Sequence, residues 1–202
     1  MNLFSNYFLA GFAFFLFAWF AIGVKTVFRN PGQQIFGYNL LKFGAATNGL
    51  GIVWSIALER DLSLLKFYTV FLCFALSLIL FRWAAYTIRH QKLSVAFSTD
   101  LPNFFIRQGP YRFIRHPFYL AYMTGYLGGI IAVPNFLTIT GTLFMLGIYI
   151  WAARFEEKKF SASDLSSEYM KYKKEVGLIF PKSIGSKISK TRKPESESEF
   201  AP

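Results

Sequence analysis

The stretch LFSNYFLAGFAFFLFAWFAIGV, residues 3–24, carries no charged side chain. As a helix it is long enough to cross the hydrocarbon core of a bilayer, which is roughly 30 Å thick. It has neither a charged leader nor a small-residue cleavage site, so we expect a retained membrane span rather than a signal peptide. This stretch therefore predicts an integral membrane protein.

Four further spans are predicted downstream. Residues 43–58 and 64–88 form two of them, and the first of these is short and rich in glycine. The apolar run 118–151 is too long for one span, and Pro134-Asn135 divides it into two helices joined by a tight turn. We therefore predict an all-α integral membrane protein with about five transmembrane helices.

Composition and charge agree with this fold class. The chain is 53% hydrophobic and 16% charged, with a formal net charge of +11. Segments 25–42, 89–115 and 154–202 contain 3, 5 and 11 of its 22 Lys and Arg residues. Basic residues between and after spans indicate membrane topology and contact with anionic lipid, not a nucleic acid partner. The positive-inside rule predicts an outside N-terminus, with the 89–115 loop and the C-terminal tail in the cytoplasm.

The chain offers little for a disulfide or a metal centre. Cys73 is its only cysteine and lies inside an apolar span. With His90 and His116 it is too scattered to match a metal-ligand spacing. We predict no metal site.

The polar C-terminal part has two sections. Apolar residues between 155 and 176 recur at mostly helical spacing, which predicts a cytoplasmic helix resting on the membrane or the core. Residues 183–202 are rich in Ser, Lys and Glu and predict a disordered polar tail. We expect one domain over residues 1–182, with the informative motifs in 89–182.

The stretch QGPYRFIRHPFY, residues 108–119, is the most informative for function. Gly109-Pro110 predicts a turn, and His116 is held out of helical geometry because a proline follows it. Pro117 suits the first turn of the fourth membrane helix, whose free amides would attract an anionic group beside Arg115 and His116. The alternative is a basic, aromatic belt at the membrane surface.

A second polar motif, Arg154-Phe155-Glu156-Glu157, follows the expected end of the fifth span. Paired carboxylates at a membrane face cost free energy unless they are solvated or paired. They can accept hydrogen bonds from a ribose diol, or pair with an ammonium or sulfonium group. The alternative is an ordinary solvated helix start.

Taken together, these motifs resemble a known family. GPYRFIRHPFY, the later Glu-Glu pair, Glu168-Tyr169-Met170-Lys171-Tyr172 and the closing Phe180-Pro181-Lys182 are similar to the isoprenylcysteine carboxyl methyltransferase family. Phospholipid N-methyltransferases are its more distant relatives. The resemblance covers roughly residues 89–182. A soluble Rossmann-type methyltransferase is excluded, because no GxGxxG motif follows a strand.

The resemblance implies a membrane methyltransferase that uses S-adenosyl-L-methionine. It assigns the cofactor site to Asn103, Phe104, Phe105, Ile106, Tyr111, His116, Pro117, Phe118 and Tyr119, with one glutamate of the acidic pair. Counting back from Glu168 selects Glu157, whereas one inserted residue selects Glu156, so both remain candidates.

The same resemblance implies a lipid or lipidated acceptor, most simply a prenylcysteine-like carboxylate. The family holds that carboxylate with an arginine four residues before its glutamate, where this chain has Ala152 or Ala153. Arg154 is the nearest arginine and is our candidate for orienting the acceptor. If it does not take this role, the acceptor is a phospholipid amine. The rival from another class is a non-enzymatic membrane protein that binds lipid head groups.

Overall fold

The computed structural model describes residues 3–29, 36–60, 62–91, 93–94, 96–98 and 101–182, so the predicted disordered tail lies outside the described residues. The helices are α1 (Leu3–Val27), α2 (Phe36–Leu58), α3 (Leu64–Thr87), α4 (Pro117–Ala132), α5 (Phe136–Ser161) and α6 (Ser166–Glu175), with a short 3-10 helix η1 (Gly109–Arg112). Two-residue strands β1 (Phe28–Arg29) and β2 (Leu93–Ser94) pair in parallel. The predicted all-α membrane fold is confirmed.

The predicted count of five spans needs one correction. Within the described residues, α1, α2, α3 and α5 are long and apolar enough to cross a membrane. The fourth helix exists where it was predicted, but α4 has only 16 residues and is therefore about 24 Å long. Prolines at both ends limit it, since Pro117 starts the helix and Pro134 follows its last residue closely.

Three predicted helix boundaries are also wrong. The second helix begins at Phe36 rather than at residue 43, and α5 continues through the acidic pair to Ser161. Hydropathy marks where a helix leaves the membrane, not where its hydrogen bonds end. The single helix predicted over 155–176 is broken before α6, where Ser163 Oγ bonds the Phe160 carbonyl at 2.8 Å.

Helix α4 forms the centre of the bundle. It contacts α1, α2, α3 and α5, and eleven of its sixteen residues are buried. A Cβ at Gly128 would lie 2.8 Å from the Phe74 ring, and one at Gly129 would lie 2.6 Å from Ile52. Small residues thus allow the close helix approach that stabilises membrane bundles. Ser77 Oγ also donates to the Ala121 carbonyl at 2.6 Å, which joins α3 to α4.

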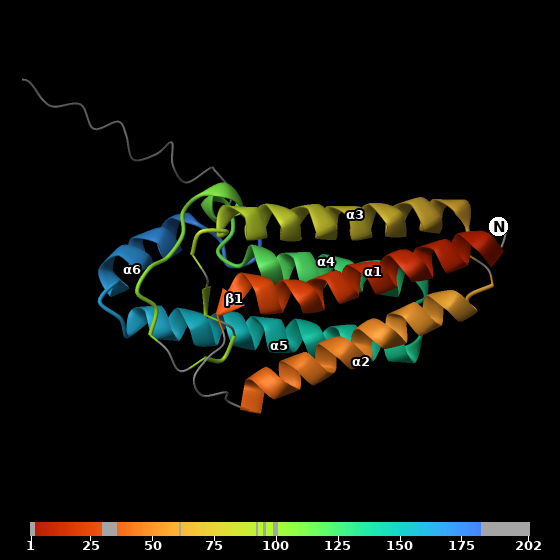
Figure 1. The fold of residues 1–202 in the computed structure, drawn as a ribbon, viewed down its shortest axis with the longest axis horizontal. Helices are drawn as coiled ribbons and strands as arrows, with labels where there is room; N and C mark the ends of the chain where they lie inside the picture. The colour runs from red at the N-terminus through yellow and green to blue at the C-terminus, as the bar shows by residue number, and fades with distance from the viewer. Residues whose placement is uncertain are drawn as a thin grey trace, which may run out of the picture.

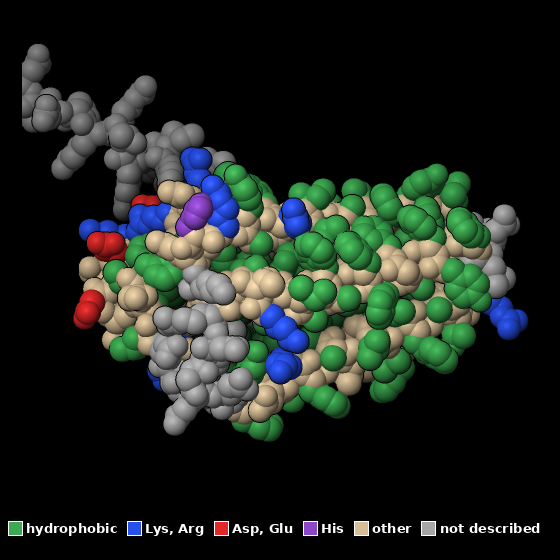
Figure 2. All heavy atoms as spheres, in the orientation of Figure 1, with side chains coloured by type: hydrophobic (Ala, Val, Ile, Leu, Met, Phe, Trp, Pro, Cys, Tyr) green, Lys and Arg blue, Asp and Glu red, His purple; other side chains and the backbone are tan. Residues whose placement is uncertain are grey.

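The two ends of the bundle differ in character. The ends of α1, α3 and α5 meet the starts of α2 and α4 at one end, which also carries the β1–β2 pair, η1 and α6 (Figure 1). Most of the charged side chains visible in Figure 2 lie at or near that end, while hydrophobic side chains cover the sides of the helices. The fold therefore brings the motif-bearing segments to the same end of the molecule.

This arrangement predicts on which sides of the membrane three exposed positions lie relative to one another. In a Cys73→Ala background, single cysteines at Gln91 and Lys171 should react with a membrane-impermeant maleimide from one side of the membrane. A cysteine at Arg60 should react only from the other side, because Arg60 follows Leu58, the last residue of α2, and that end of α2 lies at the opposite end of the bundle (Figure 1). Labelling of Gln91 and Lys171 from opposite sides would contradict the fold.

Candidate active site

A cavity lies at the motif-bearing end of the bundle, around the start of α4. It encloses about 1230 Å³ of space not filled by atoms, open solvent at its mouth included. Its walls come from α1, α2, α4, α5 and α6, and from residues 93–94, 96 and 102–106 between α3 and η1. The lining includes ten of the residues predicted from sequence: Asn103, Phe104, Phe105, Ile106, Tyr111, His116, Pro117, Phe118, Tyr119 and Glu156.

The turn before α4 forms as predicted. Gly109 has φ +55°, and a Cβ there would lie 2.2 Å from Thr87 Oγ1, so both conformation and space require glycine. The turn buries Tyr111 as part of η1. His116 precedes α4 with φ −124° and ψ 67°, and Pro117 is the first helical residue. The proline therefore sets the point at which the chain enters the bundle.

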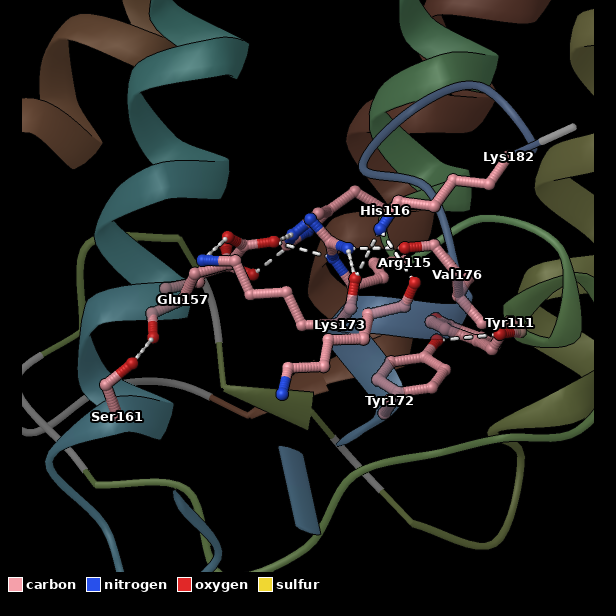
Figure 3. A network of polar contacts seen from close by, with 11 residues as sticks. Tyr111, Arg115, His116, Glu157, Ser161, Tyr172, Lys173, Val176 and Lys182 are labelled. Carbon is pink, nitrogen blue, oxygen red and sulfur yellow. Dashed lines mark hydrogen bonds and ion pairs between the residues drawn. The ribbon is translucent and has the colours of Figure 1, made fainter. Parts of the chain in front are cut away.

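Arg115 ties this entry to two other helices (Figure 3). Its Nε donates to Glu157 Oε1 on α5 at 2.7 Å, and its Nη1 donates to the carbonyls of Lys173 (3.0 Å) and Val176. Its backbone amide donates to the Gly177 carbonyl at 2.9 Å. Arg115 is therefore engaged inside the protein, rather than available beside the helix start for an anion as we expected.

The acidic pair is divided between two environments. Glu157 is 8% exposed and, besides Arg115, pairs with Lys173 Nζ at 2.8 Å. Glu156 lines the cavity, where Tyr119 donates a hydrogen bond to it and His116 Nδ1 lies 3.6 Å from its Oε2. The sequence did not decide which of the two glutamates belongs to the cofactor site. Of the two, only Glu156 lines the cavity.

Several residues that line the cavity carry buried polar atoms without a hydrogen-bond partner, although one of these atoms, His116 Nε2, lies 3.9 Å from Glu157 Oε1. Among the described residues, five buried side-chain polar atoms lack a hydrogen bond, and three belong to the lining: Tyr111 Oη, His116 Nε2 and Tyr122 Oη. Burial raises the pKa of Tyr111 well above its usual range, and the nearby Glu156 carboxylate adds to the shift. The Tyr111 hydroxyl therefore stays protonated and can donate. An unpartnered donor in a cavity wall is well suited to a polar ligand.

Aromatic residues of α6, packed against Phe105 and against Phe160 of α5, complete the cavity. Phe160 and Tyr169 stack with ring centroids 4.2 Å apart, and Phe105 packs against Tyr169 and Tyr172. Tyr172 also donates to the Tyr111 carbonyl at 2.6 Å. Sequence reasoning missed Phe160, Tyr169 and Tyr172 as lining residues. Their helical spacing was visible, but it did not reveal which surface they would cover.

The candidate acceptor residue lies elsewhere. Arg154 is exposed on α5 and is not among the lining residues. The cationic side chains that line the cavity are Arg115 and Lys159, and Lys159 Nζ donates to the Ser98 carbonyl at 2.9 Å. Over the described residues, no group of three or more His, Cys, Asp or Glu side chains could hold a metal ion.

An apolar helical bundle with a cavity at its polar end defines an integral membrane protein. A sequence model of the phospholipid methyltransferase family matches residues 65–166, which is half of the chain and includes α4 and the acidic pair. The chain belongs to this family, and its family makes it a membrane methyltransferase. The narrower resemblance to isoprenylcysteine carboxyl methyltransferases stays a prediction. No curated protein and no solved structure matches the chain.

The Arg115–Glu157 pair yields a prediction about stability. Glu157→Gln removes the charge that compensates a buried guanidinium, so it should lower the free energy of unfolding by roughly 3 kcal/mol. Glu156→Gln is the matched control, because Glu156 does not contact Arg115. Thermal unfolding of the detergent-purified variants measures the difference. Equal midpoints for the two variants would show that the pair does not hold the site together.

Proposed function

We propose that the cavity is the active site of an S-adenosylmethionine-dependent methyltransferase that acts on a lipid-like acceptor. The observation that carries the proposal is the position of the three unpartnered polar atoms. They belong to Tyr111, His116 and Tyr122, whose side chains line one cavity. Tyr111 and His116 are among the ten lining residues that the motifs predicted, and His116 Nε2 also lies 3.9 Å from Glu157 Oε1. A structural belt at the membrane surface would have no need to bury such groups.

The residues around the cavity fit the cofactor. We assign its polar contacts to Tyr111 Oη, His116 Nε2 and Glu156, and its flat contacts to Phe105 and the aromatic residues of α6. Glu156 can accept hydrogen bonds from a ribose diol or attract a sulfonium, and the cavity's aromatic faces can stabilise positive charge. When bound, S-adenosylmethionine would supply a methyl group attached to its sulfonium sulfur, which leaves as a neutral thioether. The protein contributes orientation and exclusion of water.

The charges of the cavity favour a lipid amine as the acceptor. The predicted acceptor was a prenylcysteine-like carboxylate with Arg154 as its counter-charge, but Arg154 lies outside the cavity. The Arg115 guanidinium is already bonded to Glu157 and to two carbonyls. Glu156 would repel an acceptor carboxylate, whereas it would not oppose a neutral or cationic amine.

A carboxylate acceptor is the second candidate, and Lys159 supports it. This side chain lines the cavity from α5, one turn beyond Glu156. It could supply the counter-charge that we expected of Arg154. With either acceptor, the hydrocarbon chain would reach the cavity from the bilayer, past Tyr38 and Leu41 of α2.

We further propose that the cavity faces the cytoplasm and the N-terminus lies outside. The support is the excess of Lys and Arg in the segments that meet at the cavity end. The cofactor would then enter from the cytoplasm. Labelling of Gln91 and Lys171 cysteines only from outside intact cells would overturn this orientation.

Binding of S-adenosylhomocysteine to the detergent-purified protein tests the cofactor site. Tyr111→Phe, His116→Ala and Glu156→Gln should each weaken binding about tenfold, since each removes one hydrogen bond or charge contact in a closed site. Arg154→Ala is the control and should bind like the wild type. Calorimetric titration gives the affinities. A wild-type protein that does not bind the compound would favour the non-enzymatic, lipid-binding alternative.

Labelled methyl transfer in isolated membranes tests the acceptor. An amine acceptor gives a product that keeps its label in mild alkali and migrates with phospholipids, whereas a methyl ester releases labelled methanol. With an amine acceptor, Arg154→Ala should leave the acceptor KM unchanged. Release of the label in alkali, together with a strong rise in the acceptor KM of Lys159→Ala, would instead establish the carboxylate.

A further inference from the structure

Tyr122 is a cavity residue that no sequence motif identified. It lies on α4, is 7% exposed, and its hydroxyl has no hydrogen-bond partner among the described residues. Its ring is held on several sides, by Phe20 at 4.9 Å, Tyr149 at 5.3 Å and Phe81 at 6.0 Å between centroids. The ring therefore has little freedom, and the packing fixes where the hydroxyl lies.

The neighbouring tyrosines on α4 use their hydroxyls within the protein. Tyr119, one turn earlier, donates to Glu156. Tyr126, one turn later, directs its hydroxyl to the Ala45 carbonyl at 3.5 Å and does not line the cavity. A phenylalanine at position 122 would pack equally well and would avoid burying an unpartnered hydroxyl. The Tyr122 hydroxyl therefore needs a hydrogen-bond acceptor that the described residues do not supply.

The position of Tyr122 indicates which ligand this partner belongs to. It lies about one helical turn deeper in the bundle than Phe118 and Tyr119. Two of the polar side chains assigned to the cofactor, Tyr111 and His116, come from the segment before α4, and the third, Glu156, lies in the last turns of α5. The deeper part of the cavity is the part that an acceptor entering from the bilayer reaches.

We infer that the Tyr122 hydroxyl donates a hydrogen bond to an anionic oxygen of the acceptor head group and orients that group for methyl transfer. The inference rests on the proposed function. The oxygen belongs to the phosphate when the acceptor is a phospholipid amine, and to the carboxylate when it is a prenylated cysteine. A hydroxyl donor serves both, and it discriminates against acceptors that lack such an oxygen.

The test is Tyr122→Phe, with Tyr126→Phe as the matched control on the same helix. Tyr122→Phe keeps the ring contacts and should raise the acceptor KM about tenfold. It should leave S-adenosylhomocysteine affinity unchanged, and the thermal midpoint should stay equal or rise because a buried unpartnered hydroxyl is removed. Tyr126→Phe should leave the acceptor KM and the cofactor affinity unchanged.

Direct titration with two probes keeps this test independent of turnover. These probes are a short-chain phospholipid with an ethanolamine head group and a soluble S-prenylated cysteine. Weaker binding of either probe by Tyr122→Phe, relative to Tyr126→Phe, supports the inference and identifies the source of the oxygen. Unchanged binding of both probes, or an equal loss of S-adenosylhomocysteine affinity, overturns it. A wild-type protein without methyl transfer would defeat the proposed function instead.

Discussion

The buried ion pair between Arg115 and Glu157 is the constraint on which the functional end of the molecule depends. The Arg115 guanidinium joins the segment before α4 to the side of α5 and to the carbonyls at the end of α6. Two buried charges are costly to desolvate, and removal of either leaves the other uncompensated. The pair therefore holds α6, with its tyrosines, in one place relative to the entry of α4. That place determines the shape of the cavity.

The short central helix explains why there is a cavity at this end. Helix α4 begins at Pro117, while α5 beside it continues to Ser161. The longer neighbour provides a wall that carries Glu156, Lys159 and Phe160, and α6 and residues 93–94, 96 and 102–106 provide further walls. The site thus combines membrane helices, which a lipid can approach, with polar segments, which a water-soluble cofactor can reach. A methyl transfer between two such molecules needs both.

Glu156 and Glu157 are adjacent on α5 but lie in different environments. Successive residues on a helix point about 100° apart, so Glu156 faces the cavity while Glu157 faces Arg115. Motif counting could not choose between them, because one inserted residue in 161–167 reverses the result. Helix rotation makes the choice, and it places one carboxylate at the cavity and the other against Arg115 and Lys173. Arg154 is exposed and does not line the cavity, which removes the expected counter-charge from the cavity.

By itself, the sequence determined the membrane class, the approximate positions of the five bundle helices, the Gly109 turn, the proline start of α4 and ten of the residues that line the cavity. These depend on local chemistry, namely apolar length, glycine and proline geometry, and a contiguous motif. Only the tertiary structure decided that α4 is central and short of a full span, that Glu156 rather than Glu157 lines the cavity, and that Tyr122, Tyr169 and Tyr172 line it too. These depend on helix rotation and on contacts between segments far apart in the chain. An aromatic residue at helical spacing shows a buried face, but the element packed against that face determines whether it meets a neighbour or a ligand.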